Sequence, residues 1–415
     1  MFSARFAYFP LLFAFLLGPA QVCAQADWAQ QINGNGSNLN DVAFLSTTQL
    51  VAVGQGGTVI YSTDGGMNWN DGAGIGAGDD LLSLSFNGST IVAVGKNGRV
   101  VRSLDVGVNW TEENPAAGPD LNRAVATFID NSIVAAVGKK DGTAFTVFRS
   151  TDSGDNWTQL GNPNVPTSGG KDLNAVAFSG DIGVAVGIKS GANFTFLRTI
   201  DKGLNWTQIN LAGGNDLYAV SFVTPLDVVA VGKAGVATYS SDAGATWTKV
   251  APDPSAANLN YITFNGNNVV AAGTQSGGFN LVYSQDKGVT WNTATVNGGA
   301  ASNINALASS SSIMAAVGDG GTILESTDGG VNWDAQTSGV GTNLVGVDII
   351  NPMIVVGDGG VVLLKNSQAG SGGGGGGGFS GDTYGSDAYP IDVPFGGEWL
   401  FALFVVGYGL YRLRS

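Results

Sequence analysis

Residues 62–69 read Ser-Thr-Asp-Gly-Gly-Met-Asn-Trp, and this octet decides the fold because the chain repeats it. The shared pattern is Ser/Thr-x-Asp-x-Gly-x-Asn/Thr-Trp. Seven copies end at the tryptophans Trp69, Trp110, Trp157, Trp206, Trp247, Trp291 and Trp333. Trp28 fits the same ladder without an octet, and successive intervals from Trp28 to Trp333 run from 41 to 49 residues. A period of this length predicts a repeat architecture.

Within each period, apolar and polar residues follow the short-range pattern of β-strands rather than of helices. The second period shows two such runs at 82–86 and 91–94, then a Gly-containing turn and a third run that enters the octet. One more short extended piece follows the tryptophan. Four short strands are the content of one propeller blade. A single blade cannot bury both faces, so the repeats are expected to close into a ring.

The number of blades depends on how the two ends of the repeat region combine. A Val-Gly or Ala-Gly mark follows the second strand eight times, at Gly54, Gly95, Gly138, Gly187, Gly232, Gly273, Gly318 and Gly357. The eighth unit, residues 343–366, has three strands, and the fragment around Trp28 is a fourth strand without the preceding three. We therefore predict an all-β propeller of eight four-stranded antiparallel blades, with the N-terminal strand closing the last blade. Seven blades, with one irregular unit, is the alternative.

The octet itself is suited to a turn between the third and fourth strands. A short Asp side chain accepts N–H groups of its own turn, and Gly takes the positive-φ position. The Trp ring then covers apolar surface between blades while its N–H finds an acceptor. We interpret the seven aspartates as structural, on the face opposite the usual ligand side: Asp64, Asp105, Asp152, Asp201, Asp242, Asp286 and Asp328.

These repeats resemble known families. The octet is similar to the Asp-box, also called the bacterial neuraminidase repeat. Two longer strings, 51–69 and 317–333, resemble the repeats of the photosystem II stability/assembly factor family, over roughly residues 27–366. That resemblance implies a propeller with a binding role, and the plant and cyanobacterial members carry basic residues on one face. The octet alone is also similar to repeats of sialidases, oligoxyloglucan-type glycosidases and sortilin-like receptors.

Composition narrows the chemistry that the chain can perform. The 415 residues include 65 Gly and only 12% charged residues, with a formal charge of −14. There is no His, and the single Cys is Cys23, which excludes Ser/His/Asp catalysis and most thiol and metal sites. We expect no catalytic residue, cofactor or metal. The acidic balance, with no sustained basic stripe, argues against nucleic acid as a partner.

The N-terminal residues are predicted to be a targeting signal. Residues 1–24 have the pattern of a secretory signal peptide, with Arg5 first, the apolar stretch 9–17 next and Val-Cys-Ala before the cleavage point. A lipoprotein cysteine at Cys23 is the alternative. Residues 25–369 would then form the exported propeller, in the periplasm or at the cell surface.

The C-terminal residues are predicted to attach the propeller to the cell envelope. Residues 370–389 begin with a nearly pure Gly run and predict a flexible linker. Residues 390–415 contain the apolar stretch 399–411 followed by Arg412 and Arg414, an order that resembles the C-terminal sorting signals of bacterial surface proteins. A marginal tail anchor that is never processed is the alternative. We expect the membrane to be reached only through this tail.

A candidate binding face is predicted where the repeat units grow. The turn between second and third strands shares one face with the link to the next blade, and the longer periods add residues there. The candidate residues of this face are the basic Lys96, Arg99, Lys139, Lys140, Lys189 and Lys233, with Phe145, Phe194 and Phe279 at the rim. Asp319 and Asp358 take the equivalent place in the last two units, so one side would be basic and the other acidic. Such polarity can orient a partner.

From these observations we predict a monomeric, non-enzymatic scaffold or assembly factor that binds an envelope or surface protein, or a glycan. The other interpretation of the same residues is that exposed hairpins vary in length and carry solubilising charge. A glycosidase, sialidase-like or xyloglucanase-like, or a carbohydrate-binding adhesin is the alternative function. A glycosidase requires two carboxylates that converge near the axis on the candidate face.

Overall fold

The computed structural model describes residues 28–31, 36–113, 119–121, 127–166, 169–250, 257–274, 278–350 and 352–365. The predicted signal peptide, linker and sorting segment lie outside these residues.

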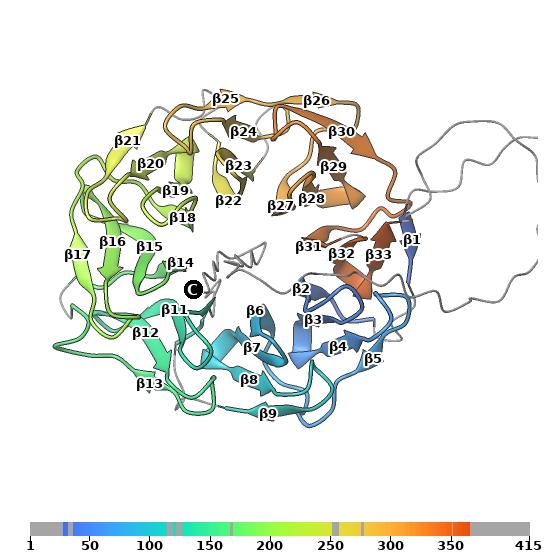
Figure 1. Cartoon of the computed structure of the whole chain (residues 1–415), viewed down its shortest axis with the longest axis horizontal. Coiled ribbons are helices and arrows are strands. Elements are labelled where there is room, and N and C mark those ends of the chain that lie inside the picture. Colours follow the sequence, from blue (N-terminus) through green and yellow to red (C-terminus); the bar gives the residue numbers. More distant parts are fainter. Residues whose placement is uncertain are drawn as a thin grey trace, which may run out of the picture.

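The described chain forms eight sheets arranged as a ring around a central axis (Figure 1), which confirms the predicted eight-bladed propeller. Blades 1 to 4 consist of β2 (Leu39–Phe44), β3 (Leu50–Gly54), β4 (Val59–Ser62), β5 (Asn70–Asp71); β6 (Leu81–Asn87), β7 (Thr90–Gly95), β8 (Val100–Ser103), β9 (Trp110–Glu112); β10 (Thr127–Phe128), β11 (Val134–Asp141), β12 (Ala144–Ser150), β13 (Thr158–Gln159); and β14 (Leu173–Ser179), β15 (Ile182–Ser190), β16 (Asn193–Thr199), β17 (Thr207–Ile209). Blades 5 to 8 consist of β18 (Leu217–Phe222), β19 (Val228–Gly232), β20 (Ala237–Ser240), β21 (Thr248–Val250); β22 (Leu259–Asn265), β23 (Asn268–Gly273), β24 (Leu281–Ser284), β25 (Asn292–Thr293); β27 (Ile304–Ser309), β28 (Met314–Gly318), β29 (Ile323–Ser326), β30 (Asn332–Gln336); and β31 (Leu344–Ile349), β32 (Met353–Gly357), β33 (Val362–Lys365), β1 (Trp28–Gln30).

The strands of a blade differ in burial because they differ in distance from the axis. The second strands are apolar at nearly every position, and β3, for example, is buried at all five of its residues. A strand that packs against a neighbouring blade on each side needs no polar face. The fourth strands lie at the outside and are short and largely exposed, as in β5. One strand was not predicted: β26 (Thr295–Asn297) runs parallel to β30 at the outer edge of blade 7.

The ring is closed by the N-terminal strand. β1 pairs antiparallel with β33, with Trp28 opposite Lys365 and Gln30 opposite Leu363. The N–H of Gln31 extends the ladder by donating to the Val362 carbonyl at 2.8 Å. Lys365 also forms an ion pair of 2.5 Å with Glu325 of blade 7. Residues from the two ends of the propeller therefore complete blade 8, as the incomplete last unit predicted.

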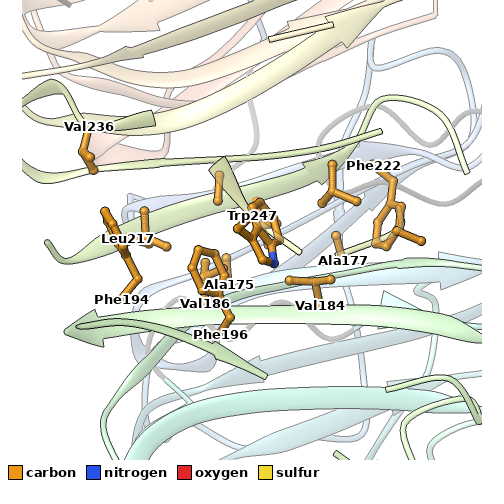
Figure 2. Packing of buried hydrophobic residues seen from close by; sticks show 14 residues of the cluster. Ala175, Ala177, Val184, Val186, Phe194, Phe196, Leu217, Phe222, Val236 and Trp247 are labelled. Carbon is orange, nitrogen blue, oxygen red and sulfur yellow. The ribbon is translucent and has the colours of Figure 1, made fainter. Parts of the chain in front are cut away.

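Aromatic packing joins neighbouring blades. The Trp247 ring of the blade 5 octet stacks on Phe196 of β16 in blade 4, with ring centroids 4.3 Å apart. Figure 2 shows this pair among Val184, Val186 and Leu217 in one apolar cluster that spans both blades. Burial of this kind at each blade junction is the main stabilising term of the ring.

The octets close the turns between third and fourth strands, at the end of the blade opposite the turn that joins strands two and three. In the first octet, the Asp64 carboxylate accepts the Asn68 N–H at 2.9 Å, and the Ser62 hydroxyl accepts the Gly66 N–H at 2.9 Å. The Trp69 indole N–H donates to the Gly66 carbonyl at 2.9 Å. The same carboxylate–N–H and indole–carbonyl bonds recur in the octets of Trp110, Trp157, Trp206, Trp247, Trp291 and Trp333.

These turns stabilise the ionised form of the octet carboxylates. Burial raises the pKa of Asp64, but hydrogen bonds from Asn68 and Ser62 outweigh it, so that its pKa lies below the ordinary value. The other six octet aspartates have lowered pKa values with the same balance of causes. Their stabilisation is present above the unfolded-state pKa, near 4, and is lost as the pH falls through the lowered values.

The closing strand should carry a measurable part of the stability. Ala29→Pro removes the N–H of Ala29, which lies opposite Leu364 in the β1–β33 ladder. We expect a loss of about 1–3 kcal/mol in the free energy of unfolding, measured by urea denaturation. Ala29→Ser keeps the N–H and is the control. Equal stability of the two variants would show that the ladder contributes little to closure.

Candidate functional site

The face that carries the turns between second and third strands is named here the hairpin face. Its architecture depends on one polar residue that precedes the first strand of each blade. These eight junction residues are Asn38, Asp80, Asp120, Asp172, Asp216, Asn258, Asn303 and Asn343. Seven of them accept a backbone N–H from the turn of the preceding blade, at 2.8–3.2 Å. The junction residues thus connect the blades around the hairpin face.

Three of the predicted basic residues serve this junction ring. Lys96 pairs with Asp80 at 2.5 Å, Lys139 with Asp120 at 2.6 Å and Lys233 with Asp216 at 3.7 Å. In each case, the lysine belongs to the same blade as its aspartate: Lys96 and Lys233 begin the turn, and Lys139 lies near the end of β11. The Lys96 ammonium holds the pKa of Asp80 below its ordinary value. The charge of these lysines is therefore balanced locally.

Arg99 was wrongly placed among the exposed binding residues. Arg99 is only 6% exposed to solvent. Its guanidinium pairs with Glu112 at 2.5 Å and donates to the carbonyls of Gly76 and Asp79 at 3.0 and 2.8 Å. Arg99 therefore holds the link between blades 1 and 2 and is not presented to a partner.

The rim aromatics also need correction. Phe145 and Phe194 are 1% and 0% exposed, since the longer periods extend the strands of blades 3 and 4 instead of adding open loops. Phe145 packs among residues that include Val165 and Leu173, while Phe194 lies against Leu217 in the cluster of Figure 2. Phe279 is half-buried in the cluster of blades 6 and 7. The three rings therefore pack into the apolar core beneath the hairpins.

The two long hairpins are also supported by the links that follow their blades. The Gly170 N–H donates to the Thr143 carbonyl at 2.9 Å, and the Gly214 N–H donates to the Ala192 carbonyl at 2.8 Å. A Cβ at either glycine would lie within 2.3 Å of the hairpin backbone, at Ala144 or Asn193. Only glycine permits this close approach, so the links pack directly against the hairpins of blades 3 and 4.

What remains on the hairpin face is a smaller basic sector than the sequence predicted. Lys140 and Lys189 are exposed and Lys171 is half-buried, and none of the three forms an ion pair with any residue that the structure describes. All three lie on blades 3 and 4, beside the long hairpins. We call them the basic sector.

An acidic sector lies across the ring. Asp319 of blade 7 accepts the amide groups of Asn303 and Asn305 at 2.7 and 2.8 Å, and Asp358 of blade 8 accepts that of Asn343 at 3.1 Å. Neither carboxylate has a Lys or Arg within ion-pair distance in the described ranges. Blades 7 and 8 stand opposite blades 3 and 4 in an eight-membered ring (Figure 1), so the face is polarised along one diameter.

A channel of about 620 Å³ lies along the axis and is lined by the first strands of the blades, with Lys96, Lys139 and Asp172 from the hairpin face. Asn40, Asn174, Asn260 and Asn305 form a polar level in its wall, on the residue after the first position of the strand. Two positions further along each strand is an apolar level: Val42, Leu84, Val176, Val220, Ile262, Leu307 and Val347. This channel was not predicted from the sequence.

Two carboxylates belong to the channel wall at the point of ring closure. Asp41 of blade 1 accepts the Leu84 N–H of blade 2 and its neighbour Val42 N–H, both at 2.9 Å. Asp348 of blade 8 accepts the Phe44 N–H of blade 1 at 2.8 Å and the Ile349 N–H at 2.8 Å. Asp41 lines the channel, whereas Asp348 is 6% exposed.

No cation compensates these two groups within the described residues. Burial raises the pKa of Asp41 to about 7, although the Leu84 and Val42 N–H groups act against it. Burial likewise raises the pKa of Asp348 to about 7, and the charge of Asp41 adds to the shift. Both carboxyls therefore titrate near neutral pH.

The described residues contain no cluster of three or more His, Cys, Asp or Glu side chains that could hold a metal ion. They also contain no helix long and apolar enough to span a membrane.

The repeat region matches the model of one protein family. The model of the photosynthesis system II assembly factor YCF48 matches residues 20–159 and 200–371, which is most of the chain. The chain belongs to this family. The matched ranges leave out 160–199, which hold β14 to β16 and the basic-sector residues Lys171 and Lys189. A comparison with curated protein sequences finds no match.

Solved structures share the fold of this YCF48-family chain at low identity. YCF48 from Cyanidioschyzon merolae is 19% identical, with a TM-score of 0.51 over 82% of this chain and 99% of its own. A structure described as YCF48 bound to D1 peptide is 16% identical, with a TM-score of 0.51 over 83% and 98%. The computationally designed Ika8 protein is 18% identical, with a TM-score of 0.61 over 81% and 100%.

The buried channel carboxylates give the YCF48-family chain a predictable pH dependence. Between about pH 4 and pH 7 the native state binds more protons than the unfolded state, so the free energy of unfolding should fall as the pH rises. In Asp41→Asn/Asp348→Asn this decline should flatten, with a gain on the order of 1–3 kcal/mol at pH 8 measured by urea denaturation. Asp71→Asn, on the exposed strand β5, is the control. A double variant that is less stable than the wild type at pH 8 would contradict the assignment.

Proposed function

We propose that this chain is a non-enzymatic scaffold or assembly factor that binds a protein partner across its hairpin face. The observation that carries the proposal is the polarisation of that face. Lys140 and Lys189 are exposed on the long hairpins and form no ion pair with a described residue, while Asp319 and Asp358 carry the opposite charge across the ring. Complementary charge of this kind orients a partner and raises its rate of association.

The family membership supports a role in binding. One structure of similar fold is described as a YCF48 with a D1 peptide bound, so a relative of this architecture holds a segment of another protein. The partner of this chain can differ, since part of the basic sector lies in the segment that the family model does not match. An envelope protein is the partner that we propose, with a surface glycan as the alternative.

The environment of the acidic residues supports a non-enzymatic role. Asp41 lines the channel near the axis, and Asp348 lies behind its wall. Each of their oxygens accepts a backbone N–H, and both groups connect neighbouring blades. Glu112 and Glu113 pair with Arg99 and Arg102. Turnover of a fluorogenic sialoside or xyloglucan oligosaccharide that is abolished in Asp41→Asn would overturn this part of the proposal.

Export and tethering remain part of the proposal on the strength of the sequence. Residues 1–24 would direct secretion, and residues 390–415 would hold the propeller at the envelope through the linker 370–389. Fractionation of cells that express the full chain or a chain without 370–415 tests the tether. Recovery of both forms in the envelope fraction would contradict it.

The basic sector provides the test of partner binding. Lys140→Gln/Lys189→Gln should reduce recovery of the envelope partners severalfold in a cross-linked pull-down at low salt, because the attraction between the charged surfaces is weakened. Lys249→Glu, on the exposed outer strand β21, changes the net charge by the same amount and is the matched control. Quantitative mass spectrometry of the cross-linked proteins is the measurement. Equal recovery with the double variant and the wild type at every salt concentration would exclude the basic sector from the interface.

A further inference from the structure

The axial channel is large enough for more than water. Its volume of about 620 Å³ lies within the range of 300–1,000 Å³ that ligand pockets occupy. The amide level of Asn40, Asn174, Asn260 and Asn305 lies toward the hairpin face, and the apolar level lies below it. A guest that enters from the hairpin face would therefore meet polar groups first and apolar groups next.

The wall of the channel is not symmetric, although the fold is. Its acid is concentrated at blades 8 and 1, where Asp41 lines the channel and Asp348 lies behind the wall. The other ionisable residues of the lining are Lys96, Lys139 and Asp172 at the hairpin face and the phenols of Tyr218 and Tyr261. Lys96 and Lys139 are paired with Asp80 and Asp120, so they do not neutralise the deeper acid.

We propose that the channel binds an extended protein segment that carries a Lys or Arg side chain, with the cation placed against Asp41. The N–H groups of Val42 and Leu84 use one acceptor position on each carboxylate oxygen of Asp41, and the Ser83 hydroxyl can act as a third donor, so an acceptor position remains for one more donor. The apolar level would bury the methylene stem of the guest side chain, and the amide oxygens of the asparagines would accept its backbone N–H groups.

Partial burial makes this cation site selective. A partly buried carboxylate without a neighbouring cation attracts a cation more strongly than one at the surface. A guest of the same size without charge would leave Asp41 uncompensated and would gain only apolar contact. Because Asp348 adds negative charge from behind, the site favours a single cation over any anion. The site is distinct from the basic sector, so it does not depend on the partner interface proposed above.

The test is calorimetric titration of the full-length protein at pH 8 with the peptide acetyl-Gly-Leu-Lys-Leu-Gly-amide. The reference peptide has norleucine in place of lysine. We expect the lysine peptide to bind at least about tenfold more tightly than the norleucine peptide. n-Butylamine, tested in parallel, should bind at least about tenfold more weakly than the lysine peptide, because it lacks the backbone and the flanking apolar residues.

The variant Asp41→Asn should reduce the affinity for the lysine peptide to that for the norleucine peptide, whereas Asp71→Asn on the outer strand of blade 1 should not. Asparagine keeps one carbonyl acceptor for the Leu84 N–H, so the wall is expected to remain folded. Binding at pH 7 should also release protons, because a cation lowers the pKa of both carboxyls. Titration in two buffers of different ionisation enthalpy measures this release.

Equal affinity of the wild type for the two peptides would overturn the channel proposal, as would unchanged binding of the lysine peptide by Asp41→Asn. Butylamine that binds as well as the peptide would show that the channel holds small amines instead of a protein segment, and would also overturn it. None of these outcomes bears on the basic sector, which is tested through Lys140 and Lys189. The two proposals can therefore fail separately.

Discussion

Closure of the ring is the constraint on which the rest of this structure depends. The second strand of each blade is apolar on both sides, so each blade is stable only between two neighbours. Blades 1 and 8 acquire their second neighbour because β1 leaves the start of the repeat region and pairs with β33 at its end. Without this pairing, the buried faces at Ile354 and Leu50 would meet water. The three-residue strand thus stabilises a core far larger than its own.

Closure alone does not fix how the blades sit against each other, and the hairpin face shows what does. A junction residue of one blade accepts an N–H from the turn of the blade before it, around nearly the whole described ring. Where that residue is Asp80, Asp120 or Asp216, a lysine of the same blade balances its charge. Much of the apparent basicity of the face therefore serves the architecture. Among the described residues, lysines without an ion pair remain on blades 3 and 4, beside Asp141 and Asp172, and aspartates without one remain on blades 7 and 8.

Much of the fold could be predicted from the sequence because its signals are local. The octet places an acceptor, a carboxylate, a glycine and an indole in one turn, and each copy marks one blade. The candidate site was harder to predict from the sequence, because the packing of the blades decides which of its side chains are exposed. Extra residues near Phe145 and Phe194 predicted open loops, yet both rings lie in regular strands whose middle residues are all buried. The junction residues could have been found, because an Asn or Asp precedes the first strand in every unit. The ion pair of Arg99 with Glu112 could not have been predicted, because it joins the residue before β8 to the end of β9.

The two channel carboxyls, Asp41 and Asp348, follow neither the repeated octet nor the repeated junction residues. Asp41 and Asp348 occupy different positions in their strands, so no repeat pattern brings them together; the closure of blade 8 against blade 1 does. At the positions equivalent to Asp41, the six other blades that the structure describes there have Ser83, Ala175, Ala219, Tyr261, Ala306 and Gly346. The positions equivalent to Asp348 hold similarly small or uncharged residues in the described blades, such as Ala43 and Ala177. The ring is built at those junctions without a carboxylate, so the repeat itself does not require one. Asp41 and Asp348 do bridge neighbouring blades, yet burial without a cation disfavours their ionised forms. A cationic guest in the channel would supply the missing charge, which the bonds within the wall do not.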